Sequence, residues 1–204
     1  AANAEAAGTY LSSAGPVNQS MGGASTAAPL DAIGATYWNP ATIGAVPNEL
    51  GVGLTLVAPV LETSSSIEGL FGDTSDSEPG ASILPTVGWV FRNEGSPWTV
   101  GLGLHAVAGV KTNYSSSTTN PIFLPQSNAQ GVPGGLGRVY AAMEWFQIAP
   151  MLSYAVSDQL SIGAGPTITS ANISLDPLVA TYPDDADGSG APRYPTGQGS
   201  RIHW

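Results

Sequence analysis

The feature that most constrains the fold of this chain is a set of long stretches in which apolar residues alternate with small or polar ones. Side chains on an extended strand point to opposite faces in turn, so a period of two predicts strands with one apolar face. The clearest stretch spans 98–111. Its apolar face consists of Trp98, Val100, Leu102, Leu104, Ala106, Ala108 and Val110, and its other face consists of Thr99, Gly101, Gly103, His105, Val107, Gly109 and Lys111. Such a strand belongs in a sheet whose two sides meet different surroundings.

The same alternation predicts strands along most of the chain. They span 49–60, 82–92, 98–111, 139–156 and 160–175, and a sixth begins in 200–204. These strands are longer than the roughly 5 to 6 residues typical of globular proteins. A tilted strand needs about 9 to 11 residues to cross a bilayer. Strand length therefore favours an all-β fold of the transmembrane antiparallel β-barrel type over a soluble sandwich.

The connections between these strands alternate between long and short. Long polar loops span 61–81, 112–138 and 176–199, and short turns span 93–97 and 157–159. Outer-membrane barrels have short periplasmic turns and long external loops. We therefore expect the strand 49–60 to start on the periplasmic side and the acidic loops to face the outside.

Composition agrees with a membrane barrel and excludes several classes of function. Only 10% of the 204 residues are charged, against roughly 25% in soluble domains. The net charge of −10, with five Lys and Arg, excludes nucleic-acid binding, because that binding needs cations to neutralise phosphates. The chain has no Cys, which excludes disulfides and thiolate metal sites. A span of the membrane must come from strands in a closed barrel, because no apolar run reaches the roughly 18 residues of a transmembrane helix.

Catalytic motifs are absent from the sequence. It contains no Gly-x-Ser-x-Gly motif, and its two histidines, His105 and His203, are not spaced as ligands of one metal. We therefore expect no enzymatic activity, no metal and no other cofactor.

Residues 1–48 differ from the rest because they are rich in Gly and Ala and lack long alternation. Turn signals such as Gly22-Gly23 interrupt them, and the stretch 28–35 predicts a short helix. The segment has too little apolar mass for a core of its own, so we expect it to fold inside an enclosure. Ala2-Asn3-Ala4 is either the end of a signal peptide or an ordinary small-residue N-terminus.

This N-terminal segment also carries a resemblance. It contains Ser20-Met21-Gly22-Gly23-Ala24, then Asp31-Ala32-Ile33, then Tyr37-Trp38-Asn39-Pro40-Ala41 just before the first strand. The pattern resembles the plug of FadL-type outer-membrane proteins. Further on, 149–156 and 158–165 are similar to the paired strands of that family around a periplasmic turn.

The resemblance implies a barrel of 14 strands with a plug, 1–48, inside its lumen. Residues 49–204 would then supply about five to six of these strands. Because so few strands cannot close a barrel, we expect the chain to be a fragment, a partly described protein or part of a larger assembly.

The function that the resemblance implies is passive transport of hydrophobic small molecules, such as long-chain fatty acids or hydrocarbons, across the bacterial outer membrane. The ligand would bind first at the outer loops, then in the lumen, and leave sideways beside the plug. The expected partners are this ligand and outer-membrane lipid. Which hydrophobic compound is carried stays open.

The strongest candidate for a plug or gate site is Asn39-Pro40-Ala41. Proline fixes its own φ and keeps the preceding residue out of the helical region, so Asn39 and Pro40 predict a rigid corner. The corner serves either in gating or only in the structure.

Two further groups are candidates for contact with ligand. Arg92, His105 and Lys111 fall on the predicted lumen face, where a cation would pair with a carboxylate; ordinary lumen polarity is the alternative, and a register slip of one residue would reverse the faces. Ile122, Phe123 and Leu124 form an apolar island in a long loop, which either captures ligand or packs on the barrel rim.

Other readings of the sequence also remain open. The acidic clusters 73–78 and 184–188 either hold Ca²⁺ or are solvated loops. The chain is alternatively a structural or adhesive outer-membrane barrel without transport, or a secreted soluble β-protein.

Overall fold

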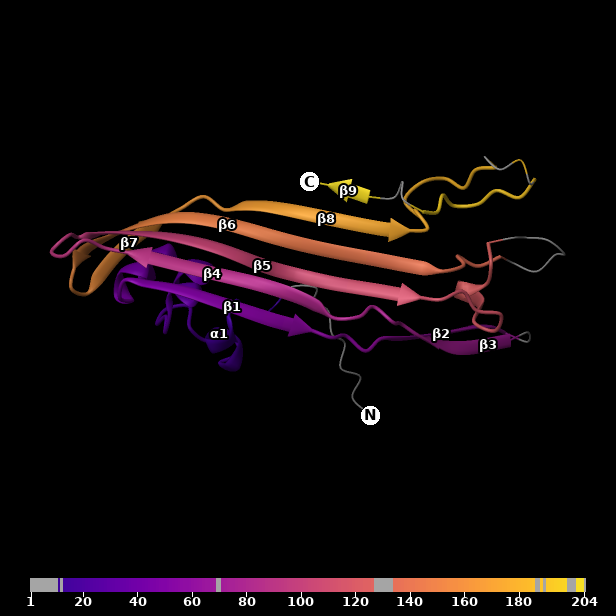
Figure 1. Ribbon diagram of the computed structural model, residues 1–204, viewed down its shortest axis with the longest axis horizontal. Helices are drawn as coiled ribbons and strands as arrows, with labels where there is room; N and C mark the ends of the chain where they lie inside the picture. The colour runs from indigo at the N-terminus through magenta and orange to yellow at the C-terminus, as the bar shows by residue number, and fades with distance from the viewer. Residues whose placement is uncertain are drawn as a thin grey trace. The chain divides into compact units, whose positions relative to one another are not determined.

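The computed structural model describes residues 11, 13–68, 71–126, 134–185, 188, 190–197 and 201–203. Strands dominate this part of the chain, and its helices are short (Figure 1). The prediction of an all-β fold is therefore confirmed. Within these described ranges, no helix combines the length and the apolar character needed to cross a membrane.

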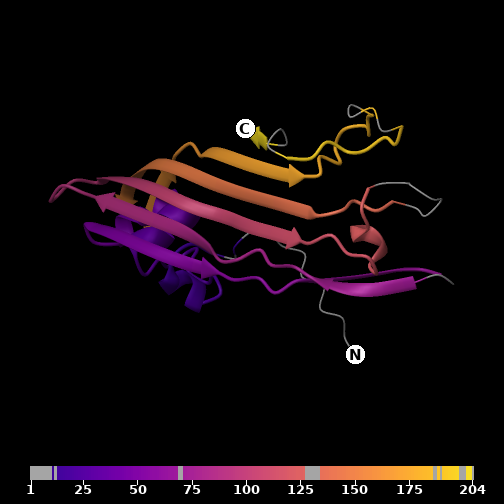
Figure 2. The same ribbon diagram turned by 45° about the vertical axis from the view of Figure 1, so that its right-hand side comes forward.

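The strands form one large sheet and one small one. The strands are β1 (Glu49–Val57), β2 (Glu62–Ile67), β3 (Phe71–Asp76), β4 (Ser82–Phe91), β5 (Trp98–Tyr114), β6 (Val139–Ser157), β7 (Leu160–Ala164), β8 (Ile168–Asp176) and β9 (Arg201–His203). The large sheet has the order β1-β4-β5-β6-β8-β9, with β7 also paired to β6, and β2 pairs with β3 alone. The neighbours in the large sheet lie side by side in Figures 1 and 2.

The predicted strand 160–175 is in fact two strands, β7 and β8, separated by residues 165–167. Pro166 has no N–H to donate to the ladder. A Cβ on Gly165 would lie 2.8 Å from the Cβ of Met151, so only glycine fits there. The chain leaves the ladder at this point and rejoins it at Ile168.

The predicted loop 61–81 contains the β2–β3 hairpin, which was not predicted. Its register pairs Glu62 with Asp76 and Ile67 with Phe71. The strands are rich in Ser and Thr, and a cross-strand pair such as Ser64 and Thr74 is joined by a hydroxyl hydrogen bond of 2.6 Å. Because these strands have no apolar face, hydrophobic alternation gave no signal for them.

The helices of the N-terminal part are α1 (Pro16–Ser20), α2 (Ala32–Trp38) and the 3₁₀-helix η1 (Pro40–Ala45). The helix predicted at 28–35 begins instead at Ala32, because Asp31 caps it by accepting a hydrogen bond of 2.7 Å from the backbone N of Gly34. It ends before Asn39, as expected for a residue that precedes proline.

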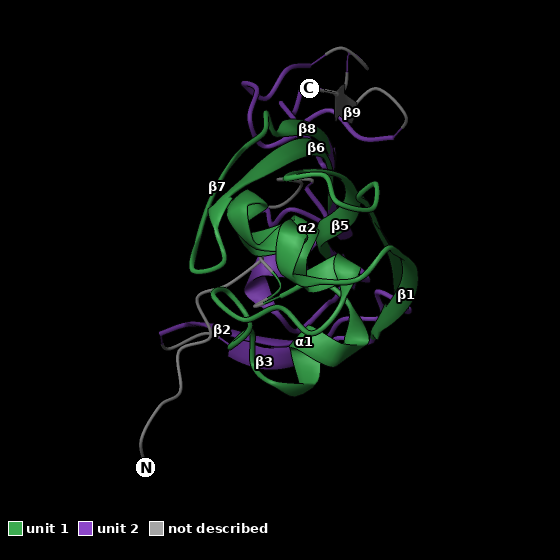
Figure 3. Ribbon diagram, turned by 90° about the vertical axis from the view of Figure 1, so that its left-hand side faces the viewer, with its two compact units in different colours: residues 1–57, 83–109, 144–171 green, residues 58–82, 110–143, 172–204 purple. Residues whose placement is uncertain are grey.

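The chain divides into two compact units (Figure 3). Unit 1 comprises 1–57, 83–109 and 144–171, and unit 2 comprises 58–82, 110–143 and 172–204. Strands β1 and β7 lie in unit 1 and strand β9 lies in unit 2, whereas β4, β5, β6 and β8 each have residues in both units.

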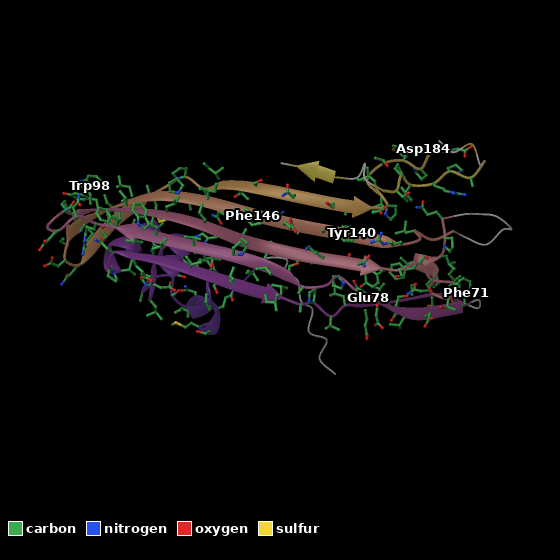
Figure 4. The ribbon with its side chains drawn as sticks, in the orientation of Figure 1. Phe71, Glu78, Trp98, Tyr140, Phe146 and Asp184 are labelled. Carbon is green, nitrogen blue, oxygen red and sulfur yellow. The ribbon has the colours of Figure 1, made fainter. Side chains whose placement is uncertain are left out.

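Unit 1 has a sheet with two different faces. The strands curve around α2, so the N-terminal helices cover one face (Figure 3). The other face exposes large apolar side chains. On β1 these are Leu50, Val52, Leu54 and Leu56, which are 66% to 68% exposed. Trp98 on β5 and Phe146 on β6, labelled in Figure 4, are also exposed. This is the apolar face that the alternation predicted.

Unit 2 contains the β2–β3 hairpin, the described parts of the long loops and the 3₁₀-helix η2 (Pro121–Phe123). Strand β5 reaches Tyr114, three residues beyond the predicted end at 111. The extension is held by the backbone of Asn113, whose carbonyl accepts a hydrogen bond of 2.9 Å from the N of Glu78. A neighbouring segment therefore supplies the hydrogen bonds that continue the strand.

Candidate functional site

The N-terminal segment, which we define as residues 13–46, packs closely on the covered face of the sheet in unit 1. The sheet residues beneath it include many glycines, which we call the glycine floor and define as Gly51, Gly53, Gly88, Gly101, Gly103 and Gly163. A Cβ added at any of them would lie within 3.2 Å of another atom. The floor therefore lets the segment approach the strand backbone itself.

Gly88 and Gly163 make the closest approaches to the backbone of the segment. A Cβ on Gly88 would lie 2.5 Å from the N of Ile33 and 2.6 Å from the carbonyl carbon of Ala32. A Cβ on Gly163 would lie 2.6 Å from the carbonyl oxygen of Pro40. Backbone atoms inside a helix do not yield cheaply, so larger residues at these two positions would displace the segment.

A small apolar core joins the segment to the sheet. Its buried members are Ala32, Ala35, Ile43, Val46 and Val90, with Met151 packed against them. Ile43 and both alanines are fully buried. Because these side chains are few and small, the apolar contribution to docking is modest.

A polar network holds the two helices of the segment together. Asn18, which is fully buried, donates through Nδ2 to Asp31 at 3.1 Å and accepts from the hydroxyl of Ser25. The carboxylate of Asp31 also caps α2. A Cβ on Gly34 would collide with the amide of Asn18, so this network requires glycine there.

The Asn39-Pro40-Ala41 corner lies between α2 and η1. Asn39 caps η1 by accepting a hydrogen bond of 3.1 Å from the N of Ala41 through its side chain. Ser153 of β6 donates to the carbonyl of Ala41 at 3.1 Å. The corner is therefore bonded to the sheet, and its role in gating stays a prediction.

His105 faces the N-terminal segment and is 2% exposed. Its Nε2 lies 3.5 Å from the hydroxyl oxygen of Thr36. The ring of Tyr37 meets its imidazole edge-on at 5.3 Å between centroids. A Cβ on Gly103 would collide with this imidazole, so the floor leaves the space that the ring fills.

Arg92 and Lys111 lie elsewhere. Arg92 is exposed at the end of β4 and donates to the carbonyl of Gly44 at 3.2 Å, while Asn48 exchanges two hydrogen bonds with its backbone. It lies six residues along β4 from Thr86, the partner of His105, which is about 20 Å at 3.3 Å per residue. Lys111 belongs to unit 2. The structure thus does not bring Arg92 and His105 together.

The apolar island of the second long loop is partly buried. Phe123 is 2% exposed and stacks on Tyr114, with 4.7 Å between ring centroids. Ile122 remains 38% exposed, and Leu124 follows as the C-cap of η2. Of the predicted capture residues, Ile122 therefore presents the most accessible apolar surface.

Asn120 organises this part of unit 2. It is fully buried, and its Nδ2 donates to the carbonyl of Thr63 at 2.9 Å and to the hydroxyl of Ser75 at 3.1 Å. Its side-chain oxygen accepts from the hydroxyl of Ser65. One amide therefore fastens the loop to both strands of the hairpin, the second of which starts at Phe71, labelled in Figure 4.

The structure describes the acidic cluster 73–78 in full and the acidic cluster 184–188 only in part. In the first, the hydroxyl of Thr119 and the N of Thr74 donate to Asp73 and lower the pKa of its carboxyl. In the second, Ala186 and Asp187 lie outside the described residues. Among the residues that are described, no three acidic or histidine side chains are grouped to hold a metal ion.

Unit 2 also contains a pocket of about 730 Å³, which we call the loop pocket. Its lining includes Gln126, Arg138, Asp176, Asp184, Arg193 and Tyr194. Gln126 accepts a hydrogen bond of 2.7 Å from the N of Tyr194, and Arg138 donates to Asn113. The pocket was not predicted, although two of the five cations in the sequence lie in its loops.

Comparison with known proteins identifies a family. The family model described as outer membrane protein transport protein (OMPP1/FadL/TodX) matches residues 1–200. Neither the curated proteins nor the solved structures gave a match.

Proposed function

This chain belongs to the OMPP1/FadL/TodX family of outer-membrane transport proteins, and from this membership we propose that it takes part in the passive transport of hydrophobic small molecules, such as long-chain fatty acids or hydrocarbons, gated by its N-terminal segment. The family is one of transporters in the outer membrane of Gram-negative bacteria, and it carries hydrophobic compounds. The specific substrate and the gate are our proposal.

The observation that carries the gate is the position of the N-terminal segment. It covers the face of the unit 1 sheet opposite the exposed apolar side chains. An exposed apolar face on a membrane strand contacts lipid, so the covered face is the lumen face. A segment that covers the lumen face is in the right place to block passage and to release it by moving.

The glycine floor supports a segment that docks without interlocking. Glycine presents no side chain, so the contact at Gly88 and Gly163 is one of backbone with backbone. Interdigitated side chains would have to be pulled apart when the segment moves, whereas flat backbone contacts separate with less rearrangement. The segment is tied down mainly by hydrogen bonds, such as that from Ser153 to Ala41.

The loop pocket and the exposed Ile122 of unit 2 are the candidates for first contact with ligand. The pocket has the guanidinium groups of Arg138 and Arg193 and the carboxyl groups of Asp176 and Asp184 beside apolar lining such as Leu136. This mixture suits an amphipathic molecule more than a pure hydrocarbon.

The experiment that tests the gate compares Asn39→Ala and Pro40→Ala with the unaltered full protein in outer membranes. We expect uptake of radiolabelled oleate to change at least severalfold in either variant, because Asn39 caps η1 and Pro40 rests on Gly163. Asn93→Ala, in the exposed turn between β4 and β5, is the control and should leave uptake unchanged. Uptake equal to wild type in both corner variants would remove the gate from the proposal.

Native mass spectrometry of the full protein in mild detergent tests the substrate class. A bound fatty acid or hydrocarbon would support transport and identify the class. Repeated preparations with nothing bound, together with no uptake of oleate or toluene, would favour a structural or adhesive role.

A further inference from the structure

Three buried polar atoms where the N-terminal segment meets the sheet of unit 1 leave their hydrogen-bonding capacity unused. Within the described residues, Ser13 Oγ, Thr86 Oγ1 and His105 Nδ1 have no hydrogen-bond partner. Their residues are 0%, 1% and 2% exposed. Buried polar groups without partners are rare in native proteins, so each calls for a reason. All three lie where the N-terminal segment meets the sheet.

Thr86 and His105 are direct neighbours. They lie opposite each other in the β4–β5 pair, where side chains of opposed residues are about 5 Å apart. A Cβ on Gly53 would lie 2.7 Å from Thr86 Oγ1 and 2.9 Å from Cδ of Pro16. The hydroxyl of Thr86 therefore lies beside a proline of the segment, which has no N–H to donate.

The neighbours of His105 offer its imidazole few hydrogen bonds. The hydroxyl of Thr36 donates to the carbonyl of Ala32 at 2.7 Å, so its Oγ1 can only accept a long bond, 3.5 Å, from Nε2 of His105, and Nδ1 stays without a partner. Tyr37 presents a ring to the imidazole. The chain just before the segment is paired to the same strand, because Leu11 N donates to the carbonyl of Val107 at 3.1 Å. Ser13 follows two residues later.

Other polar groups of the same interface are well paired. The hydroxyl of Ser153 shares its one hydrogen between the carbonyls of Ala41 and Ile162, at 3.1 and 3.3 Å, and Glu49 accepts from the N of Ala32 at 3.3 Å. Polar pairing is therefore achieved in one part of the interface and missing in another. The missing pairs destabilise only the docked state, because water can satisfy the same atoms when the segment moves away.

We propose that Ser13, Thr86 and His105 are positioning residues that keep the docking of the N-terminal segment weak, so that the segment opens readily for ligand. The proposal rests on the gate of the preceding subsection. Departures from full polar satisfaction are expected where function needs a state of limited stability. The unpaired atoms destabilise the docked segment, whereas hydrogen bonds such as that from Ser153 to Ala41 stabilise it. The difference between these two free energies determines how often the segment opens.

The test uses two nearly isosteric changes with opposite expected signs in the full protein. Thr86→Val removes an unpaired hydroxyl, so we expect opening of the segment to fall about tenfold. Ser153→Ala removes a paired hydroxyl, so we expect opening to rise about fivefold. Opening is measured by amide hydrogen exchange of residues 32–45, and uptake of radiolabelled oleate is measured on the same samples.

A second variant distinguishes the loss of an unpaired hydroxyl from a local packing effect of the valine at position 86. Ser13→Ala removes another unpaired hydroxyl without adding atoms, and it should slow exchange of residues 32–45 in the same direction as Thr86→Val. Slower exchange together with slower uptake supports both the inference and the gate. Slower exchange with unchanged uptake supports the weak docking and contradicts the gate. Exchange that is unchanged or faster in both Thr86→Val and Ser13→Ala overturns the inference, whatever the uptake.

Discussion

The two units of this chain solve the problem of holding a segment against strands in different ways. In unit 1 the N-terminal segment rests on the glycine floor, with backbone against backbone at Gly88 and Gly163. In unit 2 the loop at η2 is fastened to the β2–β3 hairpin by the side chain of Asn120 and to the end of β5 by the stacked rings of Tyr114 and Phe123. The first arrangement is shallow and the second interlocks. The difference is what we expect if the N-terminal segment moves and the loop keeps its shape.

The largest expected effect comes from filling the glycine floor. Gly88→Val places side-chain atoms against the backbone of Ala32 and Ile33, which cannot shift within α2. We expect docking of the segment to weaken by about 3 kcal/mol, with much faster hydrogen exchange over 32–45. Exchange in the β2–β3 hairpin should not change.

The matched control for Gly88→Val is Gly109→Val. Gly109 lies on the same face of the sheet, but its added Cβ would meet only the side-chain end of Leu84, which can rotate away. Equally fast hydrogen exchange over residues 32–45 in the two variants would show that docking does not depend on the glycine floor.

A smaller effect is expected from the corresponding change in unit 2. Asn120→Ala removes two donated hydrogen bonds and leaves the carbonyl of Thr63 without that donor. We expect the β2–β3 hairpin to lose about 2 kcal/mol, seen as faster exchange of residues 62–76. Ser64→Ala, which breaks an exposed hydroxyl pair, serves as the control and should cost much less. Faster exchange of residues 32–45 in Asn120→Ala would contradict the separation of the two arrangements.

Removal of the N-cap of α2 should destabilise that helix by less than Asn120→Ala destabilises the hairpin. Asp31→Ala loses the hydrogen bond from Gly34 N and the one from Asn18. A lost N-cap costs about 1 kcal/mol, so exchange within α2 should rise severalfold. Asp31→Ser restores a capping oxygen and should recover most of the loss. Equal exchange in the Ala and Ser variants would mean that capping does not stabilise α2.

The smallest expected effect is on the pKa of Asp73, which lies in the β2–β3 hairpin. Hydrogen bonds from Thr119 and Thr74 lower the pKa of Asp73, so its ionised form favours the folded loop. This contribution is present above the pKa of the unfolded chain, 3.8, and is lost as the pH falls through the lower folded value. Thr119→Val should raise the pKa of Asp73, measured by carboxyl NMR titration. An unchanged pKa would contradict the assigned cause.

The faces of the unit 1 sheet could be predicted from the sequence because side chains alternate strictly along a strand. The hairpin β2–β3 could not, since its pairs are formed by hydroxyls such as those of Ser64 and Thr74 rather than by an apolar face. The break at 165–167 was signalled locally by Gly165 and Pro166, but a continuous apolar pattern on both sides concealed it.

The candidate residues show a similar limit. Periodicity placed His105 on the covered face, but it did not indicate that Thr36 and Tyr37 would lie over the imidazole. Such contacts join residues about seventy positions apart, and no local pattern reports them. The loop pocket depends in the same way on the meeting of two long loops, at Gln126 and Tyr194.

The central claim, that the N-terminal segment must leave the sheet for ligand to pass, is tested most directly by a reversible crosslink. A Cβ on Gly44 of η1 would lie 3.4 Å from Oγ1 of Thr99 on β5, the atom that a cysteine sulfur would replace. Cysteines at these two positions are therefore placed to form a disulfide, and the chain has no native cysteine. The measurement is uptake of radiolabelled oleate by the full protein carrying Gly44→Cys and Thr99→Cys, oxidised and then reduced, with each single variant as a control. The account predicts that uptake stops in the oxidised double variant and returns on reduction. Uptake by the oxidised double variant at the rate of the reduced one would contradict it.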